Sequence, residues 1–309
     1  MIISEKNDGF ALFTPAAWLR VTGEDALVFL QGQVTQDLKT PPDGAAVYGL
    51  WLSQKGRVVA DSTFFKVNER EVWVLSHGTA SAVIRERMES YIIADDVVVD
   101  DFTEGASGLV AFGARAIAWM QQRFSSPFQP GKWLRREGGD DGSEVGFVFQ
   151  GRRGIEPCWE WVSSGRLELP PVDAGETLPL QDVERARINA GIARIPYDLG
   201  PGELPNEGGL EDLAISYTKG CYLGQETMAR LKSLGQVRRR LMRIRGSGVA
   251  PSVRPQPLFQ KGKRVGELRT TVPLTEGGFA GFALFTLLSF DPTAPVSLAV
   301  DGAPSVSAN

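Results

Sequence analysis

Cysteine and histidine are scarce in this chain. Its 309 residues contain two cysteines, Cys158 and Cys221, and a single histidine, His77. Two cysteines so far apart, with no CxxC pair, argue against a disulfide framework and against a zinc knuckle. One histidine argues against His-rich metal sites and Ser–His–Asp catalysis, because both need imidazole as a ligand or a base. The sequence therefore predicts no metal site, and acid–base chemistry would fall to carboxylates, lysine, tyrosine or cysteine.

Long apolar runs and strong net charge are missing as well. No stretch reaches the roughly 18–20 apolar residues that cross a bilayer, and the first residues, "MIISEKNDGF", lack the basic start and apolar run of a secretory signal. The net charge of −4 argues against a general nucleic-acid or anionic-membrane surface. So few cysteines fit a reduced compartment. We therefore expect a cytoplasmic monomer without a membrane partner.

The hydrophobic pattern predicts an α+β fold. Three apolar runs with short polar turns between them, 46–52, 57–67 and 71–76, predict an antiparallel meander. Helical spacing is predicted over 79–91, 178–195 and 225–234, and the Gly-rich, charged stretch 125–143 is predicted to be a surface loop. From residue 237 onward strand-like runs follow one another without helical spacing, which indicates a small β-barrel or sandwich. We therefore expect a composite α+β region over 1–236 and an all-β unit over 237–309.

The stretch "SYTKGCYLGQETMAR", residues 216–230, holds one of the two cysteines. Cys221 lies just before the predicted helix 225–234, where free backbone N–H groups and the helix dipole favour an anion. This position predicts a lowered pKa for the thiol, as would Lys219 if its side chain turned inward. Gly220 and Gly224 allow a tight turn and a close approach. The alternative, a buried cysteine that acts as a small hydrophobe, stays open for Cys221.

The other scarce residues are predicted to be structural. Cys158 lies in the apolar, aromatic run "CWEWV" and is expected in the core. His77 ends the apolar run "EVWVLS", a position in which a lone histidine is usually structural.

The motif "KGCYLGQE" resembles the signature of the YgfZ-type folate-binding proteins, which are relatives of the aminomethyltransferase (T protein) of the glycine cleavage system. Other stretches resemble the same family in the same order: "VTGEDALVFLQGQVTQD", "QKGRVVADSTFF", "ELPNEGGLEDL" and "KGKRVGELRTT". The similarity runs from about residue 10 to 290. "ARLKSLGQVRRRL" resembles the branch that includes mitochondrial iron–sulfur assembly factors. The resemblance implies two interleaved α+β units around a central, folate-sized hole, and a C-terminal β-barrel.

The resemblance also implies a function. It implies binding of tetrahydrofolate or a derivative, and a role in the assembly or maintenance of iron–sulfur proteins, including tRNA-modifying enzymes. Iron–sulfur proteins or their assembly factors would then be the partners. The functional thiol of the family corresponds to Cys221, and the rest of the motif corresponds to Lys219, Gly220, Tyr222, Gly224, Gln225, Glu226 and Arg230.

Three residues are implied as folate contacts. Asp61, in "GRVVAD", has the spacing of the aspartate that contacts folate in the aminomethyltransferases, although it could also be an exposed strand residue. Glu207 lies in the stretch that resembles the Pro-x-Glu loop. Many relatives carry a glutamate that bonds the pterin where this chain has Asn189, in "RARINAGI". A carboxylate accepts two N–H bonds and an amide offers one acceptor and one donor group, so the pterin contact is expected to differ here.

Three other functions compete with the folate-binding accessory role. The first is an aminomethyltransferase that moves a one-carbon unit onto tetrahydrofolate, so whether the protein is an enzyme stays open. The second is an RNA-binding strip in "RLKSLGQVRRRLMRIR", although Arg243 and Arg245 alternate with apolar residues as on the solvated face of a strand, which disfavours nucleic acid. The third is cluster ligation by Cys221, which has no nearby Cys or His to complete the usual set of about four ligands.

Overall fold

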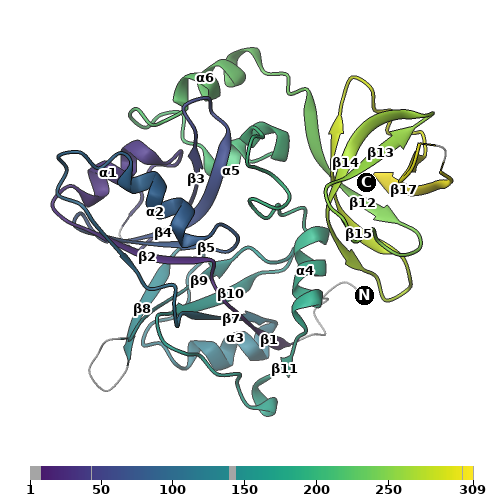
Figure 1. The fold of residues 1–309 in the computed structure, drawn as a ribbon. Helices are drawn as coiled ribbons and strands as arrows, with labels where there is room; N and C mark the ends of the chain where they lie inside the picture. Colours follow the sequence, from purple (N-terminus) through teal and green to yellow (C-terminus); the bar gives the residue numbers. More distant parts are fainter. Residues whose placement is uncertain (1–7, 43, 139–143, 301, 309) are drawn as a thin grey trace.

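The structure, a computed structural model, describes residues 8–42, 44–138, 144–300 and 302–308. Residues 1–7, on which the expectation about a secretory signal depends, lie outside this range. Two sheets stack face to face, helices cover their outer faces, and a separate β-barrel lies to one side (Figure 1). Among the described residues no helix combines the length and apolar character needed to span a membrane.

The first sheet contains the predicted meander. Its five strands have the order β3-β4-β5-β2-β6, with bounds β3 (Ala46–Leu52), β4 (Val58–Asn68), β5 (Glu71–Ser76), β2 (Ala17–Thr22) and β6 (Val98–Asp101). All neighbouring strands are antiparallel. Consecutive side chains of a strand point to opposite faces of a sheet. Both faces of this sheet are buried, each in its own hydrophobic cluster. In β2, Leu19 packs under α1 (Ala26–Gln33) and α2 (Ser81–Glu89), and Trp18 faces the second sheet.

The second sheet takes strands from distant parts of the chain. Its order is β11-β1-β7-β10-β9-β8, with bounds β11 (Glu176–Thr177), β1 (Gly9–Phe13), β7 (Ser107–Phe112), β10 (Cys158–Ser163), β9 (Glu144–Gly151) and β8 (Trp133–Gly138). Its outer face packs against α3 (Ala114–Gln121). Its inner face meets the first sheet through aromatic rings: the ring centroids of Trp18 and Phe147 lie 5.6 Å apart, and those of Phe65 and Phe147 lie 5.1 Å apart. Truncating one such buried ring to alanine typically costs about 3–5 kcal/mol.

The segment between the sheets and the barrel is mostly irregular. It contains the 3-10 helix η1 (Val172–Ala174), α4 (Leu180–Asn189), the 3-10 helix η2 (Pro205–Gly208), α5 (Glu211–Ala214) and α6 (Gln225–Leu234). Ile188 of α4 packs on Val272 and Phe282 of the barrel. Met228 of α6 and Tyr222 pack with Leu50 and Leu52 of β3. This segment therefore joins the first sheet to the barrel.

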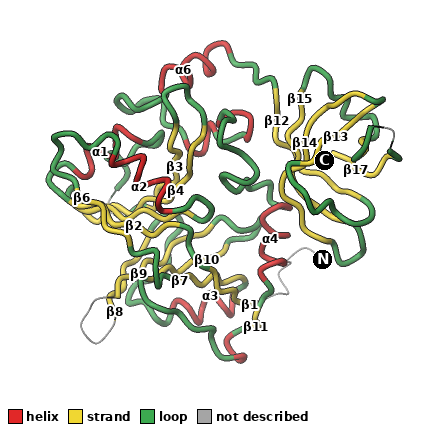
Figure 2. Tube along the Cα trace, in the orientation of Figure 1, coloured by secondary structure: helices red, strands yellow, loops and turns green. Residues whose placement is uncertain are grey.

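The C-terminal part forms a closed barrel without a helix among its described residues (Figure 2). The strands follow the order β12-β15-β14-β13-β16-β17, with bounds β12 (Arg239–Gly246), β15 (Phe279–Thr286), β14 (Lys263–Pro273), β13 (Gln256–Gln260), β16 (Val296–Ser297) and β17 (Pro304–Ala308). The pairing of β17 with β12 closes the barrel, which confirms the predicted α+β fold with a terminal barrel. The predicted division at residue 237 falls between α6 and β12, and as a boundary between independent domains it stays a prediction.

Two sequence-based expectations need correction. The stretch 125–143 contains the edge strand β8, which pairs with β9, rather than only loop; residues 139–143 lie outside the described ranges. The helix predicted over 178–195 ends at Asn189, because Gly191 adopts a φ of +73° that a right-handed helix does not contain.

Candidate functional site

A central cavity lies where the two sheets and the end of α4 meet. Its volume is about 110 Å³. The first sheet contributes Tyr48 and Asp61, the second sheet contributes Gln150 and Glu160, and Arg187 comes from α4. The lining is therefore rich in groups that ionise or form hydrogen bonds. Because its residues come from three distant parts of the sequence, the cavity is a product of the stacked sheets.

The cavity continues in two directions. On one side it shares Ala46, Tyr48, Gln150 and Arg152 with an open cavity of about 870 Å³, whose rim includes Gln36 and Asp37. On the other side it shares His77, Arg153 and Arg194 with a cavity of about 480 Å³ next to the barrel. The central volume is smaller than the roughly 300–1,000 Å³ of ordinary ligand sites. A ligand of folate size would therefore occupy the central cavity together with one of its two openings.

Asp61 has a carboxylate oxygen without a hydrogen-bond donor. Its Oδ2 accepts a hydrogen bond from Tyr48 Oη at 3.0 Å, and its Oδ1 is buried without a partner. Burial raises the pKa of Asp61 to about 6, against the opposing effects of the Tyr48 hydrogen bond and the Arg152 charge. A buried acceptor without a donor is costly. This oxygen is therefore a place where an N–H donor of a ligand would bind.

His77, Arg153 and Glu160 form a buried polar cluster in the cavity wall. Arg153 binds Glu160 through two hydrogen bonds, Nε to Oε1 at 3.1 Å and Nη2 to Oε2 at 2.9 Å. The same Nη2 lies 2.7 Å from His77 Nδ1, and His77 Nε2 lies 3.3 Å from Glu160 Oε2. Burial and the Arg153 charge lower the pKa of His77 to about 4. His77 is therefore neutral near pH 7, with its proton on Nε2, and it is a structural group that also lines the cavity.

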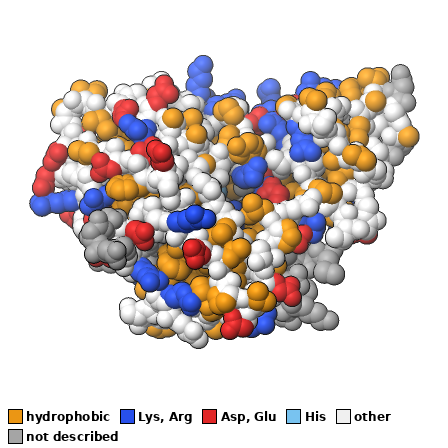
Figure 3. Space-filling model, turned by 60° about the horizontal axis from the view of Figure 1, so that its bottom comes forward, with side chains coloured by type: hydrophobic (Ala, Val, Ile, Leu, Met, Phe, Trp, Pro, Cys, Tyr) orange, Lys and Arg blue, Asp and Glu red, His pale blue; other side chains and the backbone are white. Residues whose placement is uncertain are grey.

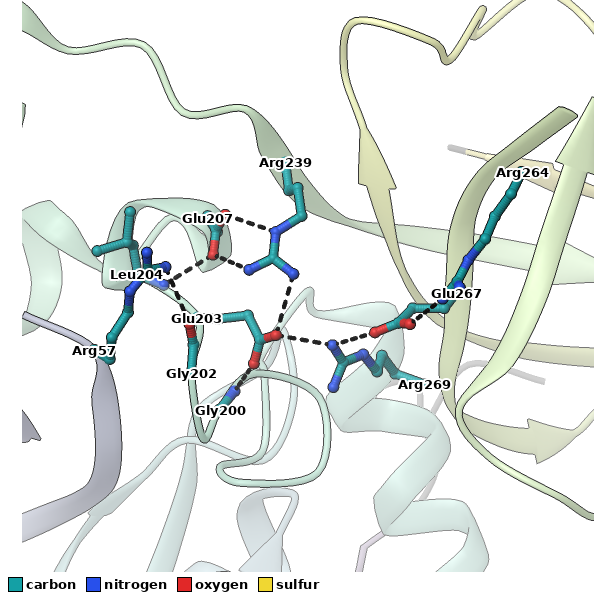
Figure 4. Close-up of polar contacts among 10 residues, drawn as sticks. All are labelled: Arg57, Gly200, Gly202, Glu203, Leu204, Glu207, Arg239, Arg264, Glu267 and Arg269. Carbon is teal, nitrogen blue, oxygen red and sulfur yellow. Dashed lines mark hydrogen bonds and ion pairs between the residues drawn. The ribbon is translucent and has the colours of Figure 1, made fainter.

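The structure does not bring Glu207 together with Asp61. Glu207 lies in η2, buried at the junction with the barrel, and both its oxygens are occupied (Figure 4). Arg239, the first residue of β12, donates to Oε1 from Nε at 2.9 Å and to Oε2 from Nη2 at 3.0 Å. The Leu204 N–H also donates to Oε2. The neighbouring Glu203 bonds Arg269 of the barrel at 3.0 Å. These carboxylates therefore join the loop to the barrel.

Asn189 also lies apart from the lining of the central cavity. It is the last residue of α4, and its backbone carbonyl accepts a hydrogen bond from Arg243 of the barrel. Arg187 and Asn189 are two positions apart, which on a helix is a rotation of about 200°. Because Arg187 lines the cavity, Asn189 points to a different side. A folate contact of Asn189 stays a prediction.

The motif of Cys221 forms an exposed loop that ends at α6. Helix α6 has the predicted bounds, and Cys221 is exposed four residues before its first residue. Gly224 has a φ of +88°, and a Cβ there would lie 2.7 Å from the Ser53 carbonyl, so only glycine fits this turn. Around Gly220 no atom lies within 4 Å of the position that a Cβ would take, so the approach to the loop is open. The structure therefore argues against a buried, structural role for this thiol.

The remaining motif residues support α6 and its packing. Arg230 Nη2 lies 2.9 Å from Glu226 Oε1, the ion pair expected from their four-residue spacing. Gln225 begins the helix, and its N–H donates to the Tyr222 carbonyl. Tyr222 is buried in the hydrophobic cluster with Met228. The ammonium of Lys219 is also buried, and its hydrogen bonds go to backbone carbonyls of residues 31–36.

The two cysteines should differ strongly in reactivity. Cys158 is fully buried in β10, and burial together with the Glu160 charge raises the pKa of its thiol to about 12. Cys221 is exposed. We expect iodoacetamide at pH 7.5 to alkylate Cys221 at least about a hundredfold faster than Cys158, because the thiolate is the nucleophile. Mass spectrometry of peptides from the native protein measures both rates, with Cys158→Ala as the control for assignment. Equal rates would contradict the structure.

Sequence reasoning did not find most of the cavity. Tyr48, Arg152, Arg153 and Glu160 lie in ordinary strands and turns, without a motif around them. The only available signal was the scarcity of histidine, which singled out His77. Among the described residues there is no group of three or more His, Cys, Asp or Glu side chains that could hold a metal ion.

Comparisons with known proteins agree with the resemblance. The family model of the GCVT N-terminal domain matches residues 13–132. The mitochondrial iron–sulfur cluster assembly factor IBA57 of Homo sapiens is 27% identical over 272 residues, which are 81% of this chain and 71% of that protein. The tRNA-modifying protein YgfZ of Colwellia psychrerythraea is 27% identical over 229 residues, 72% of this chain and 67% of that protein.

A solved structure shows the same fold. The crystal structure of aminomethyltransferase T of the glycine cleavage system from Bartonella henselae superposes with a TM-score of 0.76, at 15% identity, over 98% of this chain and 86% of that one. The sequence motifs, the family match and the fold thus point the same way: the chain is similar to the YgfZ-type proteins and to the glycine cleavage aminomethyltransferase, and it has the aminomethyltransferase-like fold.

Proposed function

We propose that this protein binds tetrahydrofolate or a derivative in its central cavity and supports the assembly or maintenance of iron–sulfur proteins, including tRNA-modifying enzymes, with Cys221 as its functional thiol. One observation carries the folate part. Asp61 Oδ1 is buried between the two sheets without a donor, in a fold shared with an aminomethyltransferase of the glycine cleavage system. The exposure of Cys221 supports the part that concerns the thiol.

The residues of the cavity fit a reduced folate. A pterin ring carries N–H donors, and Asp61 Oδ1 is an acceptor that needs one. Arg152, whose guanidinium lies 4.2 Å from the centroid of the Tyr48 ring, borders both the central and the wider cavity. It could therefore meet a carboxylate of the folate tail. When bound, the folate would supply the nitrogens that carry a one-carbon unit, and the protein would supply orientation and burial.

The iron–sulfur part rests on the relatives and on the thiol. The relatives include a protein named as an iron–sulfur cluster assembly factor and one named as a tRNA-modifying protein. A thiolate is both a nucleophile and a ligand of soft metal ions. Cys221 alone cannot supply the roughly four ligands of a stable cluster. We therefore propose a transient or bridging role, in which a partner protein supplies the other ligands.

An aminomethyltransferase activity is the second candidate. Asp61, with a pKa of about 6, could exchange a proton with a ligand near neutral pH, as a general acid or base does. Transfer of a one-carbon unit from an aminomethyl donor to tetrahydrofolate, followed by absorbance of the product, would test it. Turnover that disappears in Asp61→Asn and persists in Cys221→Ser would favour this candidate over the accessory role.

An RNA-binding strip along β12 has weaker support. Arg239 binds Glu207, Arg243 binds a backbone carbonyl of α4, and Arg245 pairs with Glu276. These arginines are thus engaged within the protein. The face seen in Figure 3 mixes basic, acidic and hydrophobic side chains without one continuous basic field. RNA retention that weakens steeply with salt would revive this candidate.

Replacing Asp61 should weaken folate binding. We expect Asp61→Ala to raise the Kd for 5-formyltetrahydrofolate, an air-stable reduced folate, by about 5- to 150-fold, which corresponds to about 1–3 kcal/mol for a lost buried hydrogen bond. Isothermal titration calorimetry measures this. Asp101→Asn, on the edge strand β6 of the same sheet and outside the cavity lining, is the matched control. If wild-type protein shows no saturable binding at millimolar folate, the folate proposal is wrong.

The same carboxylate should make binding depend on pH. Ligand N–H donors favour the ionised form, and free Asp61 has a pKa of about 6. Above pH 7 the carboxylate is already ionised and the affinity should be flat. Below pH 6 a proton must leave before binding, so the Kd should rise by about tenfold per pH unit. Asp61→Asn should remove this dependence, and an unchanged pH profile in that variant would assign the proton to another group.

A further inference from the structure

Lys219 is a buried cation in the thiol loop. Only 8% of the residue is exposed, and among the described residues no carboxylate forms an ion pair with its ammonium. Nζ donates to the carbonyls of Gln31 at 2.6 Å, Val34 at 2.7 Å and Gln36 at 2.9 Å. An ammonium has three donors, and all three are used. Lys219 therefore caps the C-terminal end of α1, where the helix dipole favours a positive charge.

Further hydrogen bonds join the thiol loop to the same segment. The Leu223 N–H donates to the Gly32 carbonyl at 3.2 Å, and the Ser216 N–H donates to the Thr35 carbonyl at 3.0 Å. Thr35 Oγ1 donates to the Ala214 carbonyl at 2.6 Å. The loop has no helix or strand between α5 and α6. Residues 31–36 therefore hold the loop, and with it Cys221, together with the packing of Tyr222 against β3.

The other side of this segment reaches the opening of the cavity. Gln36, Asp37 and Thr40 line the wide cavity that leads past Tyr48 to Asp61. Asp37 is held in place there by N–H donors from Lys39, Thr40 and Gln31. Gln36 donates from Nε2 to the Leu213 carbonyl, just before the thiol loop. One short segment thus borders the candidate ligand site and also holds the loop of Cys221.

We propose that Lys219 is a positioning residue that couples the two sites: a ligand in the cavity that contacts Gln36 and Asp37 fixes residues 31–37, and the Lys219 ammonium transmits this order to the loop of Cys221. The inference rests on the proposed function, because it makes the folate site a regulator of the thiol. It assigns Lys219 a mechanical role instead of the electrostatic activation of the thiol that the sequence suggested. By linkage, a change of the thiol loop must alter ligand affinity as well.

The rate of Cys221 alkylation tests this coupling. The full-length protein is treated with iodoacetamide at pH 7, with and without saturating 5-formyltetrahydrofolate, because burial lowers the pKa of the Lys219 ammonium to about 8 and its three N–H donors must be present during the test. Lys219→Arg, which keeps a positive charge, then distinguishes an effect on the thiol pKa from an effect on the position of the loop. We expect the folate to slow alkylation of wild-type protein at least about fivefold, the lower end of usual coupling strengths.

Three variants distinguish the effect of the Lys219 hydrogen bonds, which hold the loop, from the effect of its positive charge. Lys219→Met removes the bonds and the charge. Lys219→Arg keeps the charge, but a planar guanidinium cannot direct three N–H groups from one nitrogen. In both, we expect faster alkylation without ligand and a folate effect below about twofold. Lys263→Met is the matched control, because it removes an exposed lysine at the start of barrel strand β14, where the backbone pairs with Gln260 and not with the thiol loop or residues 31–36. It should behave as wild type.

The possible failures are distinguishable. Saturable folate binding with no change in the wild-type alkylation rate would overturn the coupling and leave the proposed function intact. Wild-type behaviour of Lys219→Arg would overturn the mechanical role and restore an electrostatic one. Absence of folate binding in calorimetry would overturn the proposed function and the coupling together, while the ligand-free rates would still decide whether Lys219 holds the loop. Circular dichroism of each variant shows that the fold persists.

Discussion

Cys221→Ser should reduce the support of iron–sulfur enzymes to the level of cells without the protein, while the fold and the folate affinity persist. Serine keeps the size and a hydrogen-bonding group but removes the sulfur that can attack an electrophile or bind a soft metal ion. Because Cys221 is exposed in the loop before α6, its replacement leaves no buried gap. The readout is the activity of an iron–sulfur tRNA-modifying enzyme in cells that lack their own copy of this protein.

Further measurements distinguish a chemical role of the Cys221 thiol from a loss of fold or of folate binding. Thermal unfolding and calorimetric titration with 5-formyltetrahydrofolate should give wild-type values for Cys221→Ser. Cys158→Ala, which leaves Cys221 as the only cysteine, should retain activity in cells. Full activity of the serine variant would rule out a chemical role for the thiol. Lost activity together with a lost fold would instead point to a structural role.

Asp198→Ala should cost about 1.5–3 kcal/mol of stability, since it removes a buried carboxylate that accepts a charge-assisted hydrogen bond, while Arg187 keeps Glu184 as its other partner. Asp198 is fully buried, and its Oδ2 accepts hydrogen bonds from Arg187 Nη1 at 2.7 Å and from the Arg194 N–H at 2.8 Å. Its Oδ1 accepts one from Thr270 Oγ1 of barrel strand β14. One carboxylate thus joins α4, the following loop and the barrel. Urea unfolding followed by tryptophan fluorescence measures the loss.

Surface ion pairs provide the comparison for Asp198. Glu89→Ala breaks an exposed pair with Arg85 in α2 and should cost only about 0.3–0.5 kcal/mol. Asp198→Asn, which keeps the shape of the side chain, should lie between the two and remains measurable if the alanine variant does not fold. A loss below about 1 kcal/mol for Asp198→Ala would mean that the carboxylate does not hold the barrel to the rest of the protein.

The sequence was most informative where local rules decide the structure. Helix α6 has its predicted bounds, because a helical apolar pattern ends at a glycine. Strands β3, β4 and β5 follow the predicted meander, since short polar turns separate apolar runs. Strand β8 was missed because it is a partly exposed edge strand in a Gly-rich, charged stretch, and its pairing with β9 makes it a strand.

The candidate site was predictable only in part. Resemblance led to Cys221 and Asp61, and the structure places both where a functional role is possible. The cluster of His77, Arg153 and Glu160 joins residues from different sheets, and no local pattern reveals which strands will face each other. Glu207 followed the resemblance but binds Arg239 at the barrel. The direction of the Lys219 side chain depends on the distant end of α1, so its sequence neighbours could not fix it.

The part of the chain that matches the family model does not contain a complete copy of the second sheet. Strand β7 pairs with β1 (Gly9–Phe13) on one side and with β10 (Cys158–Ser163) on the other. The segment that matches the model of the GCVT N-terminal domain spans residues 13–132 and includes β7 but almost none of either neighbouring strand. A gene fragment cut at these limits would expose both edges of an apolar strand, which invites aggregation. We therefore expect residues 13–132 to fold only together with the remaining strands of the two sheets.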